Sequence, residues 1–372
     1  MITKPLLKQS HHVLIADDGD ICIGEIPEVS QIFENPPVWL KPVLGKLNGK
    51  KTVPRIIKEL TSEKVQVAET EVYHLIKMLS KANLLQDNAY HSALLSNEEI
   101  ERYDRQLLQF GLIDQDRVHP YVYQERLKQS KVAIFGMGGW GTWCSLLLAQ
   151  AGVGTLKVID GDDVELSNIN RQVLYKTRDV GMQKVHAARN SINEFNPNVE
   201  VECFDQFATT IRTELERLVG NASFIVLAWA ALGSYRTGTV EEAIHTIAEE
   251  KGIPVIELGG DPLEISIGPI YPYNGTHTPY SQSHENERLR FYSTEPDIQK
   301  FQKARLKHAF IDGEREVNAW QSSPSLAAMA GLACDQIIKF ITKYDTNTIS
   351  GKRIYLDLST LSKREEVVFE CD

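Results

Sequence analysis

The sequence has few cysteines and no cysteine pair. Its 372 residues include five, none of which forms a CxxC motif with another: Cys22, Cys144, Cys203, Cys334 and Cys371. A tetrahedral structural zinc needs four ligands, and a disulfide framework needs an even set of regularly spaced cysteines. The sequence therefore predicts neither a zinc site nor a disulfide-stabilised fold.

Long apolar runs and an excess of positive charge are also lacking. No apolar run approaches the roughly 18 residues of a membrane-spanning helix, and the first residues, MITKPLLKQSHH, contain no signal-peptide core. The formal net charge of -10 disfavours a nucleic-acid-binding surface. We expect a cytoplasmic protein with no membrane and no nucleic-acid partner. Its 42% hydrophobic and 24% charged residues are typical of a globular protein, and its length allows two domains.

The most informative stretch is residues 131–184. Residues 131–135 form an apolar run, 136–141 are Gly-Met-Gly-Gly-Trp-Gly, and 142–151 have helical periodicity. The pattern predicts a strand, a glycine turn and a helix. Glycine allows the backbone to approach a phosphate closely, and the N–H groups at a helix N-terminus favour its negative charge. The candidate phosphate-binding glycines are Gly136, Gly138, Gly139 and Gly141.

A carboxylate follows the next predicted strand. Residues 156–159 are apolar, and Asp160 comes directly after them, about 20 residues beyond the glycine turn, where an acidic side chain can hold a ribose hydroxyl. Tight strand-to-helix turns also need glycine for steric reasons when no ligand is present. The glycines alone therefore leave nucleotide binding undecided.

The residues after Asp160 make the pattern specific. Residues 160–172 are Asp-Gly-Asp-Asp-Val-Glu-Leu-Ser-Asn-Ile-Asn-Arg-Gln, and residues 179–184 are Asp-Val-Gly-Met-Gln-Lys. These strings resemble the signature of the ubiquitin-activating-like superfamily, the ThiF and MoeB adenylating enzymes. The resemblance implies that ATP is bound by the four glycines together with Asp160, Asp162, Asn168, Arg171, Gln172 and Lys184. An NAD oxidoreductase is disfavoured, because hydride transfer needs a nicotinamide pocket and has no use for this string.

Three basic residues are the implied catalytic residues. Arg171 and Lys184 suit the neutralisation of triphosphate charge during adenylyl transfer. Residues 102–106 are Arg-Tyr-Asp-Arg-Gln, and in the superfamily the second arginine of this string, here Arg105, reaches the triphosphate of a partner subunit. The resemblance thereby implies a homodimer. Considered alone, the string also fits a solvated helix face with ordinary ion pairs.

The sequence departs from the superfamily at the magnesium ligand. The relatives carry an aspartate after the strand that corresponds to residues 224–227, whereas residues 228–232 here are Ala-Trp-Ala-Ala-Leu. Magnesium prefers oxygen ligands, which alanine cannot supply. We expect ATP and magnesium as cofactors, with Asp261 as the predicted magnesium ligand and Glu264 as the neighbouring candidate. Loss of catalysis is the alternative.

The sequence also departs at the superfamily's cysteines. Relatives commonly carry one CxxC pair after the strand that corresponds to residues 265–271 and another near the C-terminus, but residues 278–283 here are Thr-Pro-Tyr-Ser-Gln-Ser. This supports the prediction of no zinc site. No cysteine lies between Cys203 and Cys334, which disfavours a mechanism in which a loop cysteine accepts the activated carboxyl group.

The first 90 residues have a different pattern. Apolar segments at 12–15 and 21–23 flank Asp-Asp-Gly-Asp, which favours a hairpin, and helical periodicity follows at 38–46, 53–60 and 69–82. A hairpin with three helices resembles the winged-helix domain of ribosomal-peptide maturation systems, which receives a leader peptide as an added strand. A dimerisation module and a degenerate DNA-binding unit remain alternatives.

The expected fold class is α/β. Residues 91–372 are expected to form a Rossmann-like mixed sheet with helices on both faces, including a crossover segment at about 277–322. A small winged-helix α+β domain at residues 1–90 is expected to precede it.

The resemblance is nearest to the peptide-modifying branch that matures microcin-C-type and pantocin-type antibiotics. It implies ATP-dependent adenylation of a carboxylate or amide in a ribosomal precursor peptide with a leader, followed by intramolecular attack such as cyclisation of adjacent glutamates. A catalytically silent leader-binding partner and a sulfur-carrier-protein adenylyltransferase are the alternatives.

Overall fold

The chain folds into two compact units in a computed structural model that describes residues 2–24, 26, 29–229, 237–260, 263–274, 280–306 and 322–370. Unit 1 comprises Met1–Arg126 and Thr342–Thr346, and unit 2 comprises Leu127–Ile341 and Asn347–Asp372. The boundary predicted at residue 90 lies inside unit 1, and the division into sequence domains stays a prediction. The two units are described separately below.

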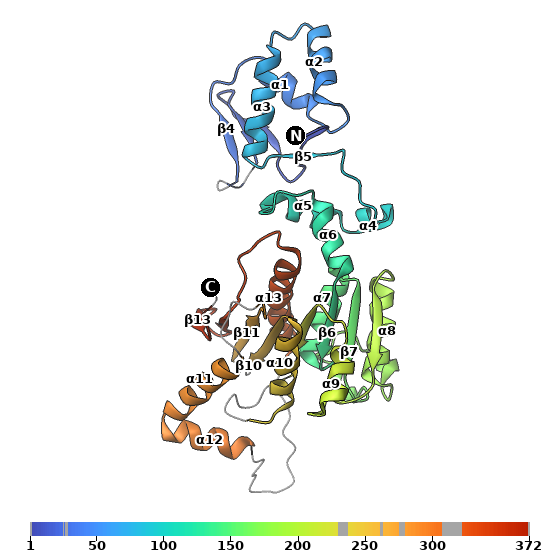
Figure 1. Cartoon of the computed structure of the whole chain (residues 1–372), viewed down its shortest axis with the longest axis vertical. Coiled ribbons are helices and arrows are strands. Elements are labelled where there is room, and N and C mark those ends of the chain that lie inside the picture. The colour runs from blue at the N-terminus through green and yellow to red at the C-terminus, as the bar shows by residue number, and fades with distance from the viewer. Residues whose placement is uncertain are drawn as a thin grey trace. The chain divides into compact units, whose positions relative to one another are not determined.

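Unit 1 begins with a small α+β arrangement (Figure 1). Strands β2 (Val13–Ile15), β3 (Ile21–Ile23) and β4 (Gln31–Phe33) form an antiparallel sheet in that order. Helices α1 (Leu40–Lys46), α2 (Val53–Ser62) and α3 (Glu69–Lys81) follow, and their apolar sides pack with β3 into one core. The predicted hairpin and three helices are confirmed, and β4 is an addition. The winged-helix classification stays a prediction.

Unit 1 extends well beyond these helices. Strand β1 (Pro5–Leu7) pairs antiparallel with β5 (Leu85–Asp87), and α4 (Asn97–Arg102), α5 (Asp104–Ile113) and α6 (Pro120–Gln129) come after it. Ser96 caps α4: its hydroxyl accepts from the Glu99 amide, and the Glu99 carboxylate accepts from the Ser96 amide. The spacing of Ser96 and Glu99 in the sequence predicts a capping box, and this reciprocal pair confirms it; the box satisfies two backbone donors that would otherwise lack partners.

A buried polar cluster lies within unit 1. The Lys8 ammonium donates to Asp114 at 2.5 Å and to the Asn83 side chain at 2.9 Å. Asp114 also accepts from the Tyr123 hydroxyl at 2.6 Å and from the Val118 amide at 3.0 Å. Burial lowers the pKa of Lys8, whereas the Asp114 carboxylate raises it. Each buried charge therefore has hydrogen-bonding partners, which is the condition under which a charged pair can be buried.

Unit 2 is built on an eight-stranded mixed sheet with the order β13-β12-β11-β10-β9-β6-β7-β8. Five neighbouring strands are parallel and the remaining three are added antiparallel. The strands are β6 (Lys131–Phe135), β7 (Thr155–Ile159), β8 (Glu200–Phe204), β9 (Phe224–Leu227), β10 (Val255–Gly260), β11 (Glu264–Tyr271), β12 (Lys352–Asp357) and β13 (Lys363–Val367). The predicted Rossmann-like mixed sheet is confirmed.

Helices cover both faces of this sheet. The intervening helices are α7 (Gly139–Ala151), α8 (Lys184–Phe195), α9 (Arg212–Val219) and α10 (Val240–Lys251). Ile225 of β9 packs into the core that α9 and α10 share, whereas its neighbour Phe224 points to the other face and contacts Phe340 of α13 (Ser323–Thr342). Because successive side chains of a strand alternate, the buried strand β9 must be covered on both sides.

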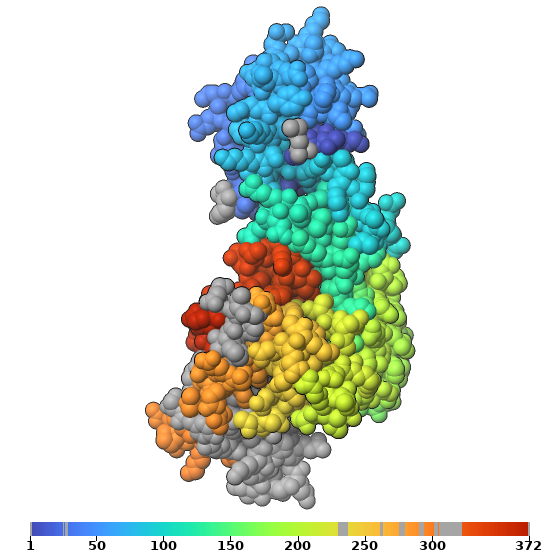
Figure 2. All heavy atoms as spheres, viewed as in Figure 1, coloured from blue at the N-terminus to red at the C-terminus, as the bar shows by residue number. Residues whose placement is uncertain are grey.

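The described part of the crossover segment is helical. It contains α11 (Tyr280–Ser293) and α12 (Pro296–Leu306), while residues 307–321 lie outside the described residues. The orange surface of α11 adjoins the yellow surface of α10 (Figure 2), and the Tyr280 ring stacks on His245 with centroids 3.8 Å apart. Arg353 of β12 pairs with Glu287 of α11 and, at 2.9 Å, with Glu257 of β10. These contacts fix α11 against the sheet.

Helix α13 is long and apolar enough to cross a bilayer by length and composition, with 20 residues and a mean hydropathy of 1.3. Several of its side chains are buried against the sheet, among them Met329, Ala333 and Ile337. The Cys334 thiol donates to the carbonyl of Cys144 in α7 at 3.7 Å. The burial of this face accounts for the apolar composition of α13.

The last strand differs from its prediction. The alternating pattern of residues 367–370 predicts a strand there, but β13 is Lys363–Val367, and it pairs antiparallel with β12 at the edge of the sheet. An edge strand with solvated side chains does not require apolar residues, so charged residues such as Lys363 and Glu365 form it. The apolar residues Val368 and Phe369 follow the strand and are buried.

Candidate nucleotide-binding site

A tight glycine turn connects β6 to α7. Gly136 has a φ of +94°, which a residue with a side chain rarely adopts. A Cβ on Gly141 would lie 1.8 Å from the carbonyl oxygen of Gly136, so only glycine fits there. A Cβ on Gly138 would have its nearest neighbour, the Gln172 side-chain nitrogen, 4.0 Å away. The backbone of the turn is therefore packed tightly against Gly141 of α7. Beside Gly138, at the N-terminus of α7, there is free space.

Asp160 is joined to this turn. It follows β7, and its carboxylate accepts from the Met137 amide at 2.6 Å and from the Asp162 amide at 2.9 Å. Burial raises the pKa of the Asp160 carboxyl, and the charge of Lys184 opposes that rise. The two backbone hydrogen bonds fix Asp160 at the carboxyl ends of β6 and β7, the edge at which open α/β sheets bind ligands.

Lys184 is a buried cation at the same edge. It is the first residue of α8, and its ammonium lies 2.6 Å from the Asp162 carboxylate. Only 7% of the Lys184 side chain is exposed, whereas 52% of the Asp162 side chain is exposed. The Lys184 amide also donates to the Asp162 carbonyl at 2.9 Å. The pair therefore places a positive charge next to Asp160.

The segment 165–172 holds three more predicted residues. The Asn168 side chain accepts from the Glu165 amide at 3.0 Å, and Arg171 donates to the Ser167 carbonyl at 2.6 Å. Among the described residues, two buried polar atoms of this segment have no hydrogen-bond partner: Nε of Arg171 and Oε1 of Gln172. Buried polar atoms are nearly always hydrogen-bonded, so such atoms are candidates for contact with a ligand.

Two predicted residues are not placed in this site. Arg105 belongs to unit 1, where 89% of its side chain is exposed and it pairs with Asp104 at 3.2 Å. Asp261, the predicted magnesium ligand, lies outside the described residues. Its neighbour Glu264 pairs with Arg364 at 3.3 Å.

No cluster suited to a metal ion is found within the described ranges. There, no three His, Cys, Asp or Glu side chains come together as a set of ligands. The predicted magnesium aspartate position falls in 228–232, of which only Ala228 and Trp229 are described. The described side chains therefore form no magnesium site among themselves, and both the magnesium ligand Asp261 and the absence of zinc stay predictions.

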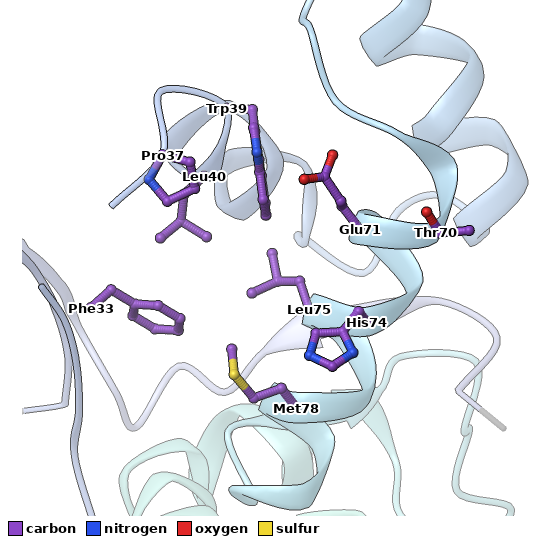
Figure 3. Close-up of a pocket in the computed structure, with 9 residues that line it drawn as sticks. All are labelled: Phe33, Pro37, Trp39, Leu40, Thr70, Glu71, His74, Leu75 and Met78. Carbon is purple, nitrogen blue, oxygen red and sulfur yellow. The ribbon is translucent and has the colours of Figure 1, made fainter. Parts of the chain in front are cut away.

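Unit 1 contains a pocket that the sequence did not predict. It has a volume of about 440 Å³ and lies beside the edge strand β4. Figure 3 shows apolar side chains from three elements converging on it, with polar side chains of α3 at one rim. The lining residues are Phe33, Pro37, Trp39, Leu40, Thr70, Glu71, His74, Leu75 and Met78. Because it forms between β4, α1 and α3, no single periodicity could have revealed it.

Comparison with known protein families agrees with the geometry of the glycine turn and the Asp160 segment. The model of the ThiF family matches residues 103–370, more than half of the chain. The chain belongs to the ThiF family. A second family model, the PaaA-like N-terminal domain, matches residues 10–69 of this ThiF-family protein.

Solved structures extend the likeness over nearly the whole chain. The crystal structure of PaaA is 54% identical, covers 98% of this chain and 100% of its own, and has a TM-score of 0.81. Escherichia coli MccB with ATP is 20% identical, covers 99% of this chain and 97% of its own, and has a TM-score of 0.69. The MccB likeness shows the fold. This ThiF-family chain therefore resembles the peptide-modifying members PaaA and MccB.

Curated relatives match a shorter region. The molybdopterin-synthase adenylyltransferase of Escherichia coli is 43% identical over 29% of this chain and 41% of its own length. The adenylyltransferase and sulfurtransferase UBA4 of Debaryomyces hansenii is 34% identical over 38% of this chain and 32% of its own. The chain thus spans less than half the length of these relatives. Together with the family match, they establish an adenylyltransferase fold.

Proposed function

We propose that this protein adenylates a carboxylate or amide of a ribosomally made precursor peptide in antibiotic biosynthesis, using ATP. The observation that carries the proposal is the convergence of the open glycine turn, buried Asp160 and the buried Lys184 ammonium at the carboxyl ends of β6 and β7. This edge offers backbone N–H groups and a cation to phosphates, and a carboxylate to a ribose.

The unpartnered atoms of Arg171 and Gln172 support an ATP fit. Both atoms are buried, and each would lose hydrogen-bonding energy on folding unless a ligand or water satisfied it. Lys184 and Arg171 would neutralise the negative charge that shifts toward the departing pyrophosphate. Asp261, the proposed magnesium ligand, lies outside the residues that the structure describes. The steps below are therefore argued from the described side chains and not from a metal ion.

The proposed reaction has two steps. A substrate oxygen attacks the α-phosphate of ATP, a new P–O bond forms, and the bond to the β-phosphate breaks to release pyrophosphate. A nucleophile of the same peptide then attacks the activated carbon and loses its proton, and AMP leaves with the bonding electron pair. We propose ring closure at adjacent glutamates as the outcome. The first step thus replaces a poor leaving group, hydroxide, with a far better one, AMP.

We propose that the leader of the precursor docks on unit 1 beside β4. This edge strand has unpaired backbone groups that can accept an added strand, and the 440 Å³ apolar pocket lies next to it. Main-chain hydrogen bonds supply affinity in this mode, and side-chain pockets supply selectivity. The likeness to MccB, which has been solved in complex with MccA, supports a peptide partner. The homodimer, with Arg105 serving the partner's site, is a further part of the proposal.

A sulfur-carrier-protein adenylyltransferase is the second candidate. The names of the curated relatives favour it, since they include a molybdopterin-synthase adenylyltransferase and adenylyltransferases that are also sulfurtransferases. Those two matches cover only 29% and 38% of this chain. The PaaA-like match at residues 10–69 instead favours a peptide substrate.

The test uses purified protein, ATP with magnesium chloride, and a candidate precursor peptide, to be sought as a short open reading frame beside the gene. Arg171→Ala and Lys184→Ala should each lower peptide-dependent pyrophosphate release roughly a hundredfold or more, because a charge that acts on the transition state is removed. Arg178→Ala is the control, since this arginine is 68% exposed and pairs with Glu194. Unchanged nucleotide consumption in both site variants would contradict the mechanism. Peptide binding with no pyrophosphate release in the wild type would identify a silent partner.

A further inference from the structure

The indole of Trp229 lies beside the glycine turn, at the end of the strand that is farther from Asp160. Trp229 follows β9, and a Cβ on Gly136 would lie 3.6 Å from its Cε3 atom. In the sheet, β6 has β9 as its neighbour on one side and β7 on the other. The proposed phosphate site at the end of β6 therefore has Asp160 on one side and Trp229 on the other.

The indole is held in place by its neighbours. Its N–H donates to the carboxylate of Glu241, which lies in the first turn of α10. Its ring meets that of Phe135 edge to face, with the centroids 5.9 Å apart and the planes at 88°. It packs against the core that α9 and α10 share, yet it stays partly exposed. The indole N–H is its single hydrogen-bonding group and Glu241 satisfies it, so the rest of the ring is an apolar surface.

The chain around Trp229 is apolar as well. Residues 228–232 are Ala-Trp-Ala-Ala-Leu, of which the structure describes the first two. Ala228 contacts the turn directly: a Cβ on Gly136 would lie 3.1 Å from its carbonyl oxygen, and a Cβ on Gly141 would lie 3.6 Å from its methyl group. The side chains of Ala228 and Trp229 thus leave the β9 side of the turn without a group that could bind water through a side-chain hydrogen bond.

The β9 side of the phosphate is the side of the attacking oxygen. Arg171 and Lys184, which are proposed to neutralise the pyrophosphate, belong to the segment that follows β7. In phosphoryl-type displacement the attacking and leaving oxygens lie roughly in line, on opposite sides of the phosphorus atom. Pyrophosphate that leaves on the β7 side therefore places the activated group of the substrate on the β9 side, next to Trp229.

We propose that Trp229 is a specificity-determining residue that shields the acyl adenylate from water and so reserves it for the nucleophile of the same peptide. This inference rests on the proposed adenylation and concerns the fate of its product. Closing a site against water is a known means of preventing hydrolysis of a reactive intermediate. The partly exposed indole covers the place where water would otherwise approach the activated carbon.

The two fates of an activated carboxylate differ only in the attacking group. In ring closure, the peptide nucleophile forms a bond to the activated carbon, the bond from that carbon to the AMP oxygen breaks, and the nucleophile's proton passes to solvent. In hydrolysis, the oxygen of water forms the new bond, AMP leaves in the same way, and the original carboxylate returns. Hydrolysis therefore consumes ATP without changing the mass of the peptide, whereas each ring closure lowers that mass by one water.

The experiment measures this partition on the full-length protein with ATP, magnesium chloride and the candidate precursor peptide. Pyrophosphate release is compared with the number of waters lost from the peptide by mass spectrometry, and reactions in heavy-oxygen water label the carboxylates that hydrolysis regenerates. Trp229→Ala removes the indole, Trp229→Phe keeps an aromatic ring, and Glu241→Ala removes the partner that holds the indole. Glu250→Ala is the matched control, because Glu250 is also a carboxylate of α10 with an arginine partner, Arg212, but is 48% exposed.

Trp229→Ala should raise the pyrophosphate released per ring closed roughly tenfold and should add heavy oxygen to the peptide, because water then competes for the adenylate. Its ATP affinity in calorimetry should not change. Glu241→Ala should shift the ratio in the same direction by less, and it decides the question if Trp229→Ala does not fold. Trp229→Phe and Glu250→Ala should keep the wild-type ratio.

Two other results would have different meanings. A wild-type ratio of pyrophosphate to ring closure in folded Trp229→Ala, or in Glu241→Ala where the first variant does not fold, would overturn the shielding role and leave adenylation intact. A wild type that releases no pyrophosphate with the peptide would instead overturn the proposed function.

Discussion

The ammonium of Lys8 lies 2.5 Å from the carboxylate of Asp114, and 1% and 2% of the two side chains are exposed. The residues are 106 positions apart, one next to β1 and the other at the end of α5. This pair makes the N-terminal sheet and helices one body with α5. Removal of residues 1–90 would leave Asp114 without its cation. Single substitutions are therefore a better way than truncation to test what the N-terminal part binds.

Replacing Lys8 tests how strongly this pair holds unit 1. Lys8→Met should lower the free energy of unfolding by about 3 to 5 kcal/mol, because the Asp114 carboxylate stays buried without its counter-charge. Lys46→Met is the control, since Lys46 pairs with Glu63 at a partly exposed position, where solvent screening makes an ion pair contribute little to stability. Denaturant unfolding followed by circular dichroism measures both. Similar losses in the free energy of unfolding in the two variants would show that the buried pair stabilises unit 1 no more than the partly exposed pair does.

His119 should make unit 1 acid-sensitive. Its ring stacks on that of Tyr90 and is half-buried, and this burial lowers its pKa from 6.5 to about 4. Because the folded pKa is below the unfolded one, the unfolded state binds the proton more readily between these values. The contribution of the neutral His119 ring to the free energy of unfolding is complete above about pH 6.5. It is lost as the pH falls toward 4, and the loss is about 2 kcal/mol after allowance for the partial exposure of the ring.

The measurement is the free energy of unfolding against pH in the wild type and in His119→Gln. Glutamine keeps hydrogen-bonding capacity but does not titrate, so the variant should show a shallower decline between pH 6.5 and 4. Below about pH 4 the two curves should run parallel. Identical slopes across the whole interval would mean that His119 keeps an ordinary pKa in the folded protein.

Two glycines of the turn should respond differently to alanine. Gly141→Ala places a Cβ 1.8 Å from the Gly136 carbonyl oxygen, and the turn must distort, so we expect a loss of at least about 3 kcal/mol of stability. Gly138→Ala meets nothing closer than 4.0 Å and should cost about 1 kcal/mol or less. ATP affinity should nevertheless fall in Gly138→Ala, because the new methyl group occupies the space open to phosphate.

Thermal unfolding and calorimetric ATP titration separate the two effects. A Gly138→Ala variant with normal stability and normal ATP affinity would place the phosphates elsewhere. Gly331→Ala, in the helix α13, serves as the control for a harmless glycine substitution, since no atom lies within 4 Å of its added Cβ.

The pocket beside β4 should govern peptide affinity. Met78→Asp puts a charge into the apolar pocket and should weaken binding of a fluorescent leader peptide at least tenfold, as measured by anisotropy. Tyr73→Asp is a control on the same helix: Tyr73 is 40% exposed and Met78 39%, but Tyr73 does not line the pocket. Equal affinities in the two variants would exclude this pocket from leader recognition.

Local patterns predicted much of the fold and of the candidate nucleotide site. Strand β9 has the bounds 224–227 that were read from the sequence, since it is a short buried apolar run. Asp160, Lys184 and the glycines meet as expected, because strand–turn–helix geometry fixes where the ends of parallel strands lie. Helix α11 was not predicted, because its few apolar residues are scattered among polar and charged ones without a helical period, and tertiary contacts such as Glu287 with Arg353 hold it.

Features that join distant segments could not be predicted. Strand β1 is three residues long and pairs with β5 some 80 residues later, so neither strand has a periodicity of its own. The pairing of Lys8 with Asp114 and the contact of Phe207 with Gly161 likewise depend on tertiary packing. A local pattern specifies an element, whereas these contacts depend on how elements meet.

The five residues Thr342–Thr346 have a consequence for biosynthesis. They belong to unit 1, where the Tyr344 ring packs 4.9 Å from Phe110 and the Gln115 amide donates to the Tyr344 carbonyl at 3.0 Å. A ribosome that has completed Arg126 must add more than two hundred residues before these contacts can form. At a synthesis rate of roughly 5 to 20 residues per second, on the order of ten to forty seconds pass between the completion of Arg126 and that of Thr342. During this time unit 1 lacks the side chains of Thr342–Thr346 in its core. Maturation of the N-terminal unit is thus coupled to completion of nearly the whole chain.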